Sequence, residues 1–325
     1  MDDPTDIHRF VHQSIHFLRE SHPLSGVLTS TRGVTVAKAR GNIPRRRLGR
    51  YLRDLRQQSN LTLADAAKRI GRGAGTLQRL ETGDGGKIVV ADIENLCELY
   101  GAQAMLDGLK GLAQQANAPA WWHEYSDLFT KGFDLYVDLE ATAETLMVYR
   151  PDIISGLFQT TEYARTLDRN YFPDDSPAEI ERRVQLRVQR QRLITRKLSP
   201  AQVDLIIDEG VLRRVVGGAK TMSGQLLHLA SLPPTVTVRV LPSAVGFPLG
   251  VSPGPFTVMD FGQDNRGYPI EPTVVYVEAY TGAMYYERAD IVRRYRAAHR
   301  MLRQVALDES RSKNLLRQVA KEYAP

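Results

Sequence analysis

The stretch from residue 45 to residue 83 constrains the fold most strongly, because helix starts, apolar faces and helix stops follow one another there at short intervals. Leu48, Leu52 and Leu55 recur at spacings of three and four, which places them on one face of a first helix. Thr62 then stands where the N-cap of a second helix belongs. Two helices of this stretch are therefore indicated by local signals alone.

Glycines delimit a third, short helix. Gly71 ends the second helix in the left-handed backbone conformation that glycine adopts at little cost, and Gly83 closes the third helix, which we predict over Ala74–Thr82. Leu77 and Leu80 would face inward. Three polar side chains would face outward: Thr76, Gln78 and Arg79. Two short helices joined by a tight turn form a helix-turn-helix, whose second helix enters a DNA major groove.

Basic side chains are concentrated in the same stretch. Residues 41–83 contain ten Lys or Arg against three Asp or Glu, a net charge of +7, whereas the whole chain carries +6. The rest of the chain is therefore close to neutral as a whole. A three-helix bundle with no nucleic-acid role would not need this concentration, whereas binding to phosphates requires it. The charge distribution favours DNA binding.

The run LRDLRQQSNLTLADAAKRIG, followed by TLQRLETG, resembles the lambda-repressor-like (Xre-type) helix-turn-helix family. The resemblance implies an all-α domain in which Arg56, at the end of the first helix, pairs with Glu81, at the end of the third. This chain departs from the family at three positions. Ala74 and Gly75 occupy the first positions of the reading helix, and Leu63 stands where relatives often have a phosphate-binding glutamine.

DNA contacts are therefore expected from the polar and basic side chains that remain. The set comprises Arg45, Arg46, Arg47, Thr62, Arg72, Thr76, Gln78 and Arg79. Arg79 is the best candidate for a bidentate contact with guanine, because its guanidinium matches the O6 and N7 acceptors; the alternative is a phosphate contact. The arginines at 45–47 would form an arm that contacts phosphates irrespective of sequence.

Length and composition suit a protein of two domains. The chain has 325 residues, of which 25% are charged and 42% hydrophobic, as in soluble globular proteins. No apolar run approaches 18 residues, and the start MDDPTDIHRF is unlike a signal peptide. The single cysteine, Cys97, excludes a disulfide within the chain and a cysteine-based zinc site. We expect a cytoplasmic protein that associates with the nucleoid when bound to DNA.

A linker predicted at residues 114–119 divides the chain. We predict an N-terminal extension (1–43), a helix-turn-helix domain (44–118) and a larger domain (119–325).

The extension contains three histidines at helical spacing, His8, His12 and His16. Such spacing could bind a transition metal. A polar helix face is the simpler interpretation, and we expect no metal site.

The larger domain combines helices with β-branched runs. Strands are predicted at 203–207, 235–241, 255–261 and 273–280. Helices are predicted at 177–197, 209–216, 221–231, 286–306 and 309–323. One strand, two helices and then three consecutive strands predict an α+β domain with a mixed or antiparallel sheet. The fold class is therefore multidomain, with an all-α domain followed by a larger α+β domain.

A series of short motifs in this domain resembles the C-terminal domain of the WhiJ-like proteins, an actinobacterial group of Xre-type regulators. The motifs are SGLFQTTEYA from residue 155, R-x-x-R-Q from 187, D-E-x-x-L-R from 208, Q-L-x-x-L from 225, V-L-P from 240 and V-V-Y-x-E from 274. Members of the group act in developmental or antibiotic control and often pair with a small protein encoded nearby. The resemblance thus implies a small acidic partner protein, as in toxin–antitoxin pairs.

Enzymatic activity is not expected. Asp208, Glu209, Glu278 and Glu287 could supply carboxylates and His228 a base, but no nucleophile elbow, P-loop or H-E-x-x-H motif accompanies them.

These polar residues have simpler structural interpretations. Glu278 would be a buried acid paired with Arg213 or Arg239, and the Gly217-Gly218 pair would end a helix. His228 would lie in the core or at the surface. The arginines between 182 and 197 could bind an anion or an acidic partner, or could form a solvated helix face.

The sequence therefore predicts a sequence-specific DNA-binding transcriptional regulator without a cofactor. Its partners would be double-stranded DNA and a second copy of the chain, since helix-turn-helix domains of this size bind paired half-sites as dimers. The larger domain would serve for dimerisation and for effector or partner binding. Two alternatives are an antitoxin-like protein that sequesters a small partner and regulates its own gene, and a regulator that senses a small molecule.

Overall fold

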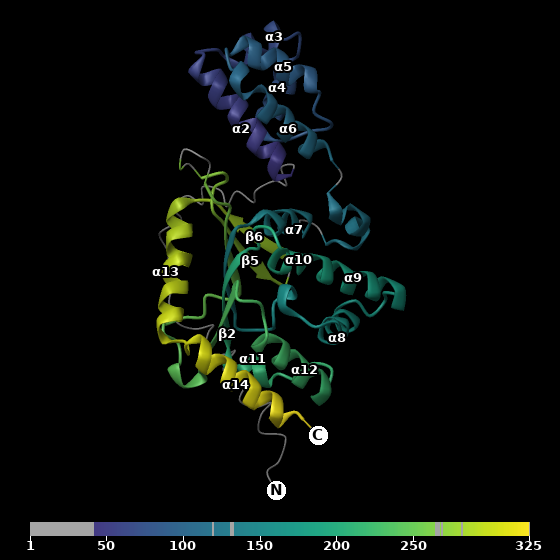
Figure 1. Ribbon diagram of the computed structural model, residues 1–325, viewed down its shortest axis with the longest axis vertical. Coiled ribbons are helices and arrows are strands. Elements are labelled where there is room, and N and C mark those ends of the chain that lie inside the picture. The colour runs from purple at the N-terminus through teal and green to yellow at the C-terminus, as the bar shows by residue number, and fades with distance from the viewer. Residues whose placement is uncertain are drawn as a thin grey trace, which may run out of the picture. The chain divides into compact units, whose positions relative to one another are not determined.

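The computed structural model describes residues 42–118, 120–130, 133–263, 267, 269–280 and 282–324. The described residues belong to one compact unit. This unit contains a helical domain followed by a larger domain built on a six-stranded sheet (Figure 1), which confirms the predicted fold class. The histidines of the N-terminal extension lie outside the described residues.

The helical domain extends from α2 to α6. Its elements are α2 (Ile43–Gln58), α3 (Leu63–Arg69), α4 (Ala74–Thr82), α5 (Val90–Leu99), the 3-10 helix η1 (Gln103–Met105) and α6 (Leu106–Asn117). Because α6 continues to Asn117, most of the segment that we expected to be a linker at 114–119 is helical.

Local signals determine where α3 begins and where α3 and α4 end. Thr62 Oγ1 accepts a hydrogen bond from the Asp65 N–H (3.1 Å), which satisfies one of the free amides of the first turn of α3. Gly71 and Gly83 have φ values of +67° and +74°, in the left-handed region that favours glycine. All three residues act as predicted, and α4 has the predicted bounds Ala74–Thr82.

The helices of this domain share a small apolar core. Leu48 and Leu52 of α2, Leu77 of α4 and Ile93 and Leu96 of α5 are almost completely shielded from solvent. Each side chain of this kind contributes about 1.5–3 kcal/mol on burial. The first leucines identified in the sequence therefore hold α2 against the reading helix.

A single sheet organises the larger domain. Its strands are β1 (Thr145–Arg150), β2 (Gln202–Asp208), β3 (Val236–Leu241), β4 (Phe256–Asp260), β5 (Val274–Ala279) and β6 (Gly282–Tyr286). They lie in the order β3-β2-β1-β4-β5-β6. The pairs β1–β2 and β2–β3 are parallel, whereas β1–β4, β4–β5 and β5–β6 are antiparallel. The sheet is therefore mixed.

Two of these strands were not predicted. β1 lies at the centre of the sheet, but only two residues separate it from the preceding helix, so its apolar residues continue a helical pattern in the sequence. β6 is a short edge strand that begins at a glycine. β1 is defined by pairing with β2 and β4, which lie far away in the sequence, whereas β6 pairs with β5 directly before it.

Helices cover both faces of the sheet (Figure 1). These and the short helical turns are η2 (Trp121–Leu128), α7 (Phe133–Thr142), η3 (Gly156–Phe158), α8 (Thr161–Tyr171), α9 (Pro177–Arg190), α10 (Arg192–Thr195), α11 (Glu209–Arg213), α12 (Ala219–Ala230), η4 (Ser243–Val245), α13 (Ala289–Val305) and α14 (Glu309–Glu322). The largest apolar core includes residues of α7, α12 and α14 on one face of the sheet. On the other face, Val292 and Leu302 of α13 pack against Ile206, Phe256 and their neighbours.

The helix predicted at 177–197 is interrupted at Gln191 and ends at Thr195. Gln191 separates α9 from α10, and its side chain donates a hydrogen bond to Gln159 O (2.7 Å) in the loop that precedes α8. This tertiary contact lies 32 residues away in the sequence, so helical periodicity could not indicate it.

Candidate nucleic-acid interface

Close backbone packing places α4 against α2. A Cβ atom added to Gly49 of α2 would lie 2.5 Å from Leu80 O and 2.7 Å from Glu81 O. Real side chains do not tolerate such contacts with a backbone, so the helices can approach this closely only because residue 49 is glycine. The position of α4 on α2 is therefore defined sterically.

A buried ion pair secures the end of α4. Glu81 is 3% exposed and accepts hydrogen bonds from Arg56 Nε (2.7 Å) and Nη2 (2.9 Å). The Arg56 guanidinium also donates to Leu61 O (2.8 Å), and its hydrogen bond with Glu81 raises the pKa of Arg56. Burial, followed by the charge of Glu81, raises the pKa of nearby Tyr100 to about 12. The structure thus joins the two residues that the family resemblance paired.

The opposite face of α4 is open to solvent. Leu77 points into the core, whereas Thr76, Gln78 and Arg79 are exposed. Arg79 Nη2 donates to Thr76 Oγ1 at 3.4 Å. Hydroxyl, amide and guanidinium groups of this kind form hydrogen bonds with base edges. The structure therefore brings together the three predicted readers on one exposed face.

Two other predicted DNA contacts are already bonded within the protein. Arg72 Nε donates to both carboxylate oxygens of Asp92 (3.0 and 3.1 Å), so part of its charge is balanced. Thr62 Oγ1 caps α3 and donates to Asp65 Oδ2 (2.6 Å). Only the Nη groups of Arg72, whose side chain is 43% exposed, stay available to a phosphate.

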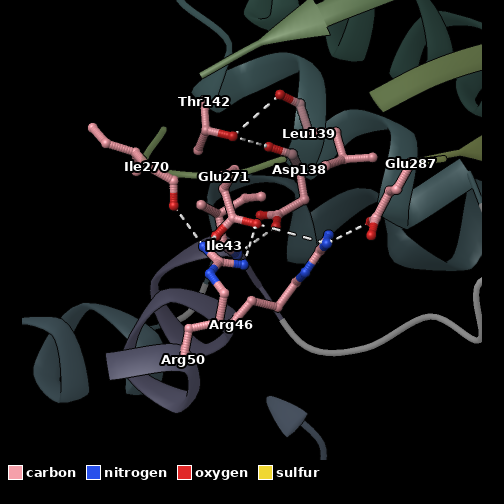
Figure 2. A network of polar contacts seen from close by, with 9 residues as sticks. All are labelled: Ile43, Arg46, Arg50, Asp138, Leu139, Thr142, Ile270, Glu271 and Glu287. Atoms are coloured by element: carbon pink, nitrogen blue, oxygen red, sulfur yellow. Dashed lines mark hydrogen bonds and ion pairs between the residues drawn. The ribbon is translucent and has the colours of Figure 1, made fainter. Parts of the chain in front are cut away.

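Residues 45–47 do not form the expected arm, because they belong to the first turns of α2, and a phosphate contact by Arg47 stays a prediction. Arg45 is buried and donates to Gly86 O (2.6 Å), and burial lowers its pKa. Arg46 forms an ion pair with Glu287 of the larger domain (2.7 Å; Figure 2). Asn42 caps α2, and Pro44 lies in its first turn. Both residues favour a helix start at this point, so residues 45–47 are helical.

Three exposed basic residues near α4 were not among the predicted DNA contacts. Lys68 and Arg69 lie in the last turn of α3, and Lys87 follows α4. None of the three forms an ion pair with another residue that the structure describes. The net charge of residues 41–83 indicated that basic side chains are available to DNA. It could not show which arginines form ion pairs within the protein instead.

The arginines of α9 bind carboxylates of the protein itself. The pairs are Arg182–Asp127, Arg183–Asp175, Arg187–Asp168 and Arg190–Glu140. Arg190 is buried, and its guanidinium carbon lies 5.3 Å from the centre of the Tyr136 ring. The Arg182 and Asp127 side chains are 42% and 60% exposed, so this pair lies on a solvated face, one of the two predicted alternatives. Arg183, Arg187 and Arg190 are largely shielded from solvent and fit neither predicted role. The four arginines attach α9 to η2, α7 and α8.

The predicted environment of Glu278 is also wrong. Its side chain is 48% exposed and pairs with Arg150 (2.9 Å), because β5 leaves the apolar core before this residue. Arg213 instead pairs with Glu322, and Arg239 lies 3.7 Å from Asp204.

Gly217 and Gly218 do not end the helix before them. α11 ends at Arg213, and the two glycines, with φ values of +69° and +85°, form the turn that begins α12. His228 is half-buried on α12, and burial lowers its pKa. Across the described part of the chain, no group of three or more His, Cys, Asp or Glu side chains could hold a metal ion. Among the same residues, no helix is long and apolar enough to cross a membrane.

Together, the order of α2, α3 and α4 and the exposed polar face of α4 define a helix-turn-helix protein. Residues 47–107 match the model of a helix-turn-helix domain. Residues 133–318, more than half of the chain, match the domain of unknown function DUF5753. The chain therefore belongs to the DUF5753 family and carries a helix-turn-helix domain ahead of the DUF5753 domain. No curated protein and no solved structure matches the chain.

Proposed function

We propose that this protein is a sequence-specific DNA-binding transcriptional regulator of the Xre type, without enzymatic activity. The observation that carries the proposal is the exposed face of α4, where Thr76, Gln78 and Arg79 lie on a helix held by Gly49 packing and the Arg56–Glu81 pair. A pre-positioned helix loses little conformational freedom when it enters a major groove. The protein would act in the cytoplasm, associated with the nucleoid.

Sequencing the DNA that the protein retains in cells tests this proposal. We expect one recurring motif, and we expect the purified protein to bind that motif about 10³-fold more tightly than random DNA of equal length at the same salt concentration. Equal affinity for the recovered DNA and for random DNA would exclude sequence-specific binding and, with it, the proposed regulation.

For the larger domain we infer a role in dimerisation and in effector or partner binding. Support for an acidic protein partner, as in the antitoxin-like alternative, comes from α13. This helix exposes Arg293, Arg294 and Arg300, and no acidic residue occurs between residues 291 and 307. The three arginines have no carboxylate partner among the described residues. Apolar Met301 is exposed on the same helix, so the surface suits an acidic protein better than a bare anion.

Co-purification separates this alternative from regulation by the chain alone. The protein is co-expressed with the product of the adjacent gene, and Arg293, Arg294 and Arg300 are replaced together by Gln. We expect a complex that the triple variant loses. Wild-type protein that elutes without the neighbouring product would exclude the antitoxin-like role.

A further inference from the structure

The first turns of α2 contact the larger domain as well as the helical domain. Ile43, the first residue of α2, is buried in the large apolar core with Leu135 and Leu139 of α7. Its N–H donates to Asp138 Oδ2 of the same helix (3.0 Å; Figure 2). The amides of a first helical turn lack partners within the helix and favour a negative charge, so Asp138 acts as an additional cap.

A buried carboxylate next to this contact binds two arginines of α2. Only 1% of the Glu271 side chain is exposed. Arg50 donates to both of its oxygens, one at 2.8 Å, and to the neighbouring Ile270 O (2.5 Å). Arg46 Nη2 lies 3.6 Å from Glu271 and 2.7 Å from Glu287 (Figure 2). A carboxylate with so little solvent requires these charges, because an unpaired buried charge is strongly destabilising.

The next turns of the same helix hold the reading helix. Gly49 lies against the backbone of Leu80 and Glu81, and Arg56 binds the Glu81 carboxylate. Arg53 Nη2 also donates to Glu81 O (3.2 Å). α2 is therefore a continuous helix with two buried glutamates as partners, Glu271 in the larger domain and Glu81 at the end of α4.

We infer that α2 is the element through which the larger domain positions the reading helix, and that Glu271 is the positioning residue of this connection. The inference rests on the proposed DNA-binding function and names how that site is controlled. Any partner or effector that moves the segment around Glu271 would move α2 and, through Gly49 and Arg56, α4.

A partner or effector would control DNA binding by changing the orientation of the helical domain and not by covering α4. Thr76, Gln78 and Arg79 are exposed while the contacts of Glu271 are formed. Loss of these contacts would thus free the helical domain to rotate without uncovering new DNA-binding surface. Affinity for a preferred DNA site should fall, since a fixed orientation would have to be restored on binding.

Calorimetry of the full chain tests the connection in the absence of DNA. We expect wild-type protein to unfold in one transition. Glu271→Gln keeps the shape of the side chain but removes its charge, and should split the trace or lower its first midpoint by about 5 °C or more. Arg50→Gln removes the partner and leaves Arg46 to neutralise Glu271, so it provides a second variant if the first folds poorly. Glu94→Gln, which removes a surface ion pair with Lys110 inside the helical domain, is the matched control.

The double variant shows whether the two residues act together. Because the Arg50–Glu271 bond is already lost in each single variant, Arg50→Gln combined with Glu271→Gln should unfold no earlier than the less stable single variant. The inference would be overturned if the midpoint shifts of the two single variants added up in the double variant. It would also be overturned if the Glu271 and Arg50 variants unfolded at the same midpoint as Glu94→Gln.

DNA binding separates a positioning role from a purely structural one. On the preferred site, Glu271→Gln should bind about fivefold or more weakly than wild type, with unchanged affinity for random DNA. Unchanged preferred-site affinity together with a lower midpoint would overturn the positioning role. If wild-type protein shows no sequence preference, the proposed function fails, whereas the calorimetric result stands by itself.

Discussion

At the scale of single residues, the exposed and the buried charges of the helical domain have different effects. Glu81 is buried with Arg56, so removing the carboxylate leaves a guanidinium with no balancing charge in a poorly solvated position. Arg79 is exposed and bonded only to Thr76, so its removal disturbs nothing within the protein. The first residue should therefore matter for folding and the second for DNA recognition.

We expect Glu81→Ala to destabilise the helical domain by about 3–5 kcal/mol, because it removes one partner of a buried ion pair. Thermal unfolding followed by circular dichroism measures the effect, with Glu98→Ala on the exposed side of α5 as the control. A Glu81→Ala variant with the melting curve of wild type would show that the pair contributes nothing.

Arg79→Ala should cost about 1–3 kcal/mol on the preferred DNA and relax the preference at one base pair, since a bidentate guanine contact is lost. Affinity for random DNA should hardly change. Arg69→Ala, an exposed arginine of α3, serves as the comparison and should weaken all sequences alike while lowering the salt dependence. Equal losses on preferred and random DNA for Arg79→Ala would place this residue among the phosphate contacts.

At the scale of elements, α13 is attached to the sheet by a polar cluster as well as by its apolar face. His299 is buried, and its Nε2 lies 3.2 Å from Asp204 O of β2. Burial lowers the pKa of His299, against the opposite effect of the Asp204 carboxylate, while Arg303 and Arg239 lower it further. The imidazole is therefore neutral in the folded protein near pH 7.

This shift predicts a loss of stability in mild acid. The folded pKa of His299 lies below its ordinary value of 6.5, so the unfolded chain takes up the proton first as the pH falls. The stabilisation is fully present above that value and decreases below it, by at most about 1.4 kcal/mol per pH unit. Between pH 7.5 and 5.5, the melting temperature of His299→Gln should fall less than that of wild type. The exposed His123→Gln variant should follow wild type; identical pH profiles for all three proteins would contradict the prediction.

At the scale of the whole molecule, the α2 contacts make the helical domain part of the same compact unit as the sheet. One helix-turn-helix domain contacts only a few base pairs, so a regulator of this size needs two such domains at a defined separation. A dimer formed by the larger domain would set that separation, because α2 attaches each reader to it.

We therefore expect a homodimer at micromolar concentration, with twice the 36.5 kDa mass of the chain in light scattering. The mass should not change in Arg79→Ala, which alters only the DNA-binding face. A mass of one chain, both alone and on DNA, would refute dimerisation.

The sequence by itself determined the helix-turn-helix, because its signals are local. Thr62, Gly71 and Gly83 act on residues within one or two turns, and the leucines of α2 define a face by spacing alone. The same holds for β2 and β3, whose β-branched runs lie close to the predicted limits.

Only the tertiary structure decided which charges are available and that residues 145–150 form a strand. Arg50 meets Glu271 across 221 residues, and the arginines of α9 meet acids from three other elements. β1 becomes a central strand through pairing with β2 and β4. Ion pairs and sheet ladders join residues that are distant along the chain, so neither periodicity nor a charge count can specify the partner; folding alone brings the partners together.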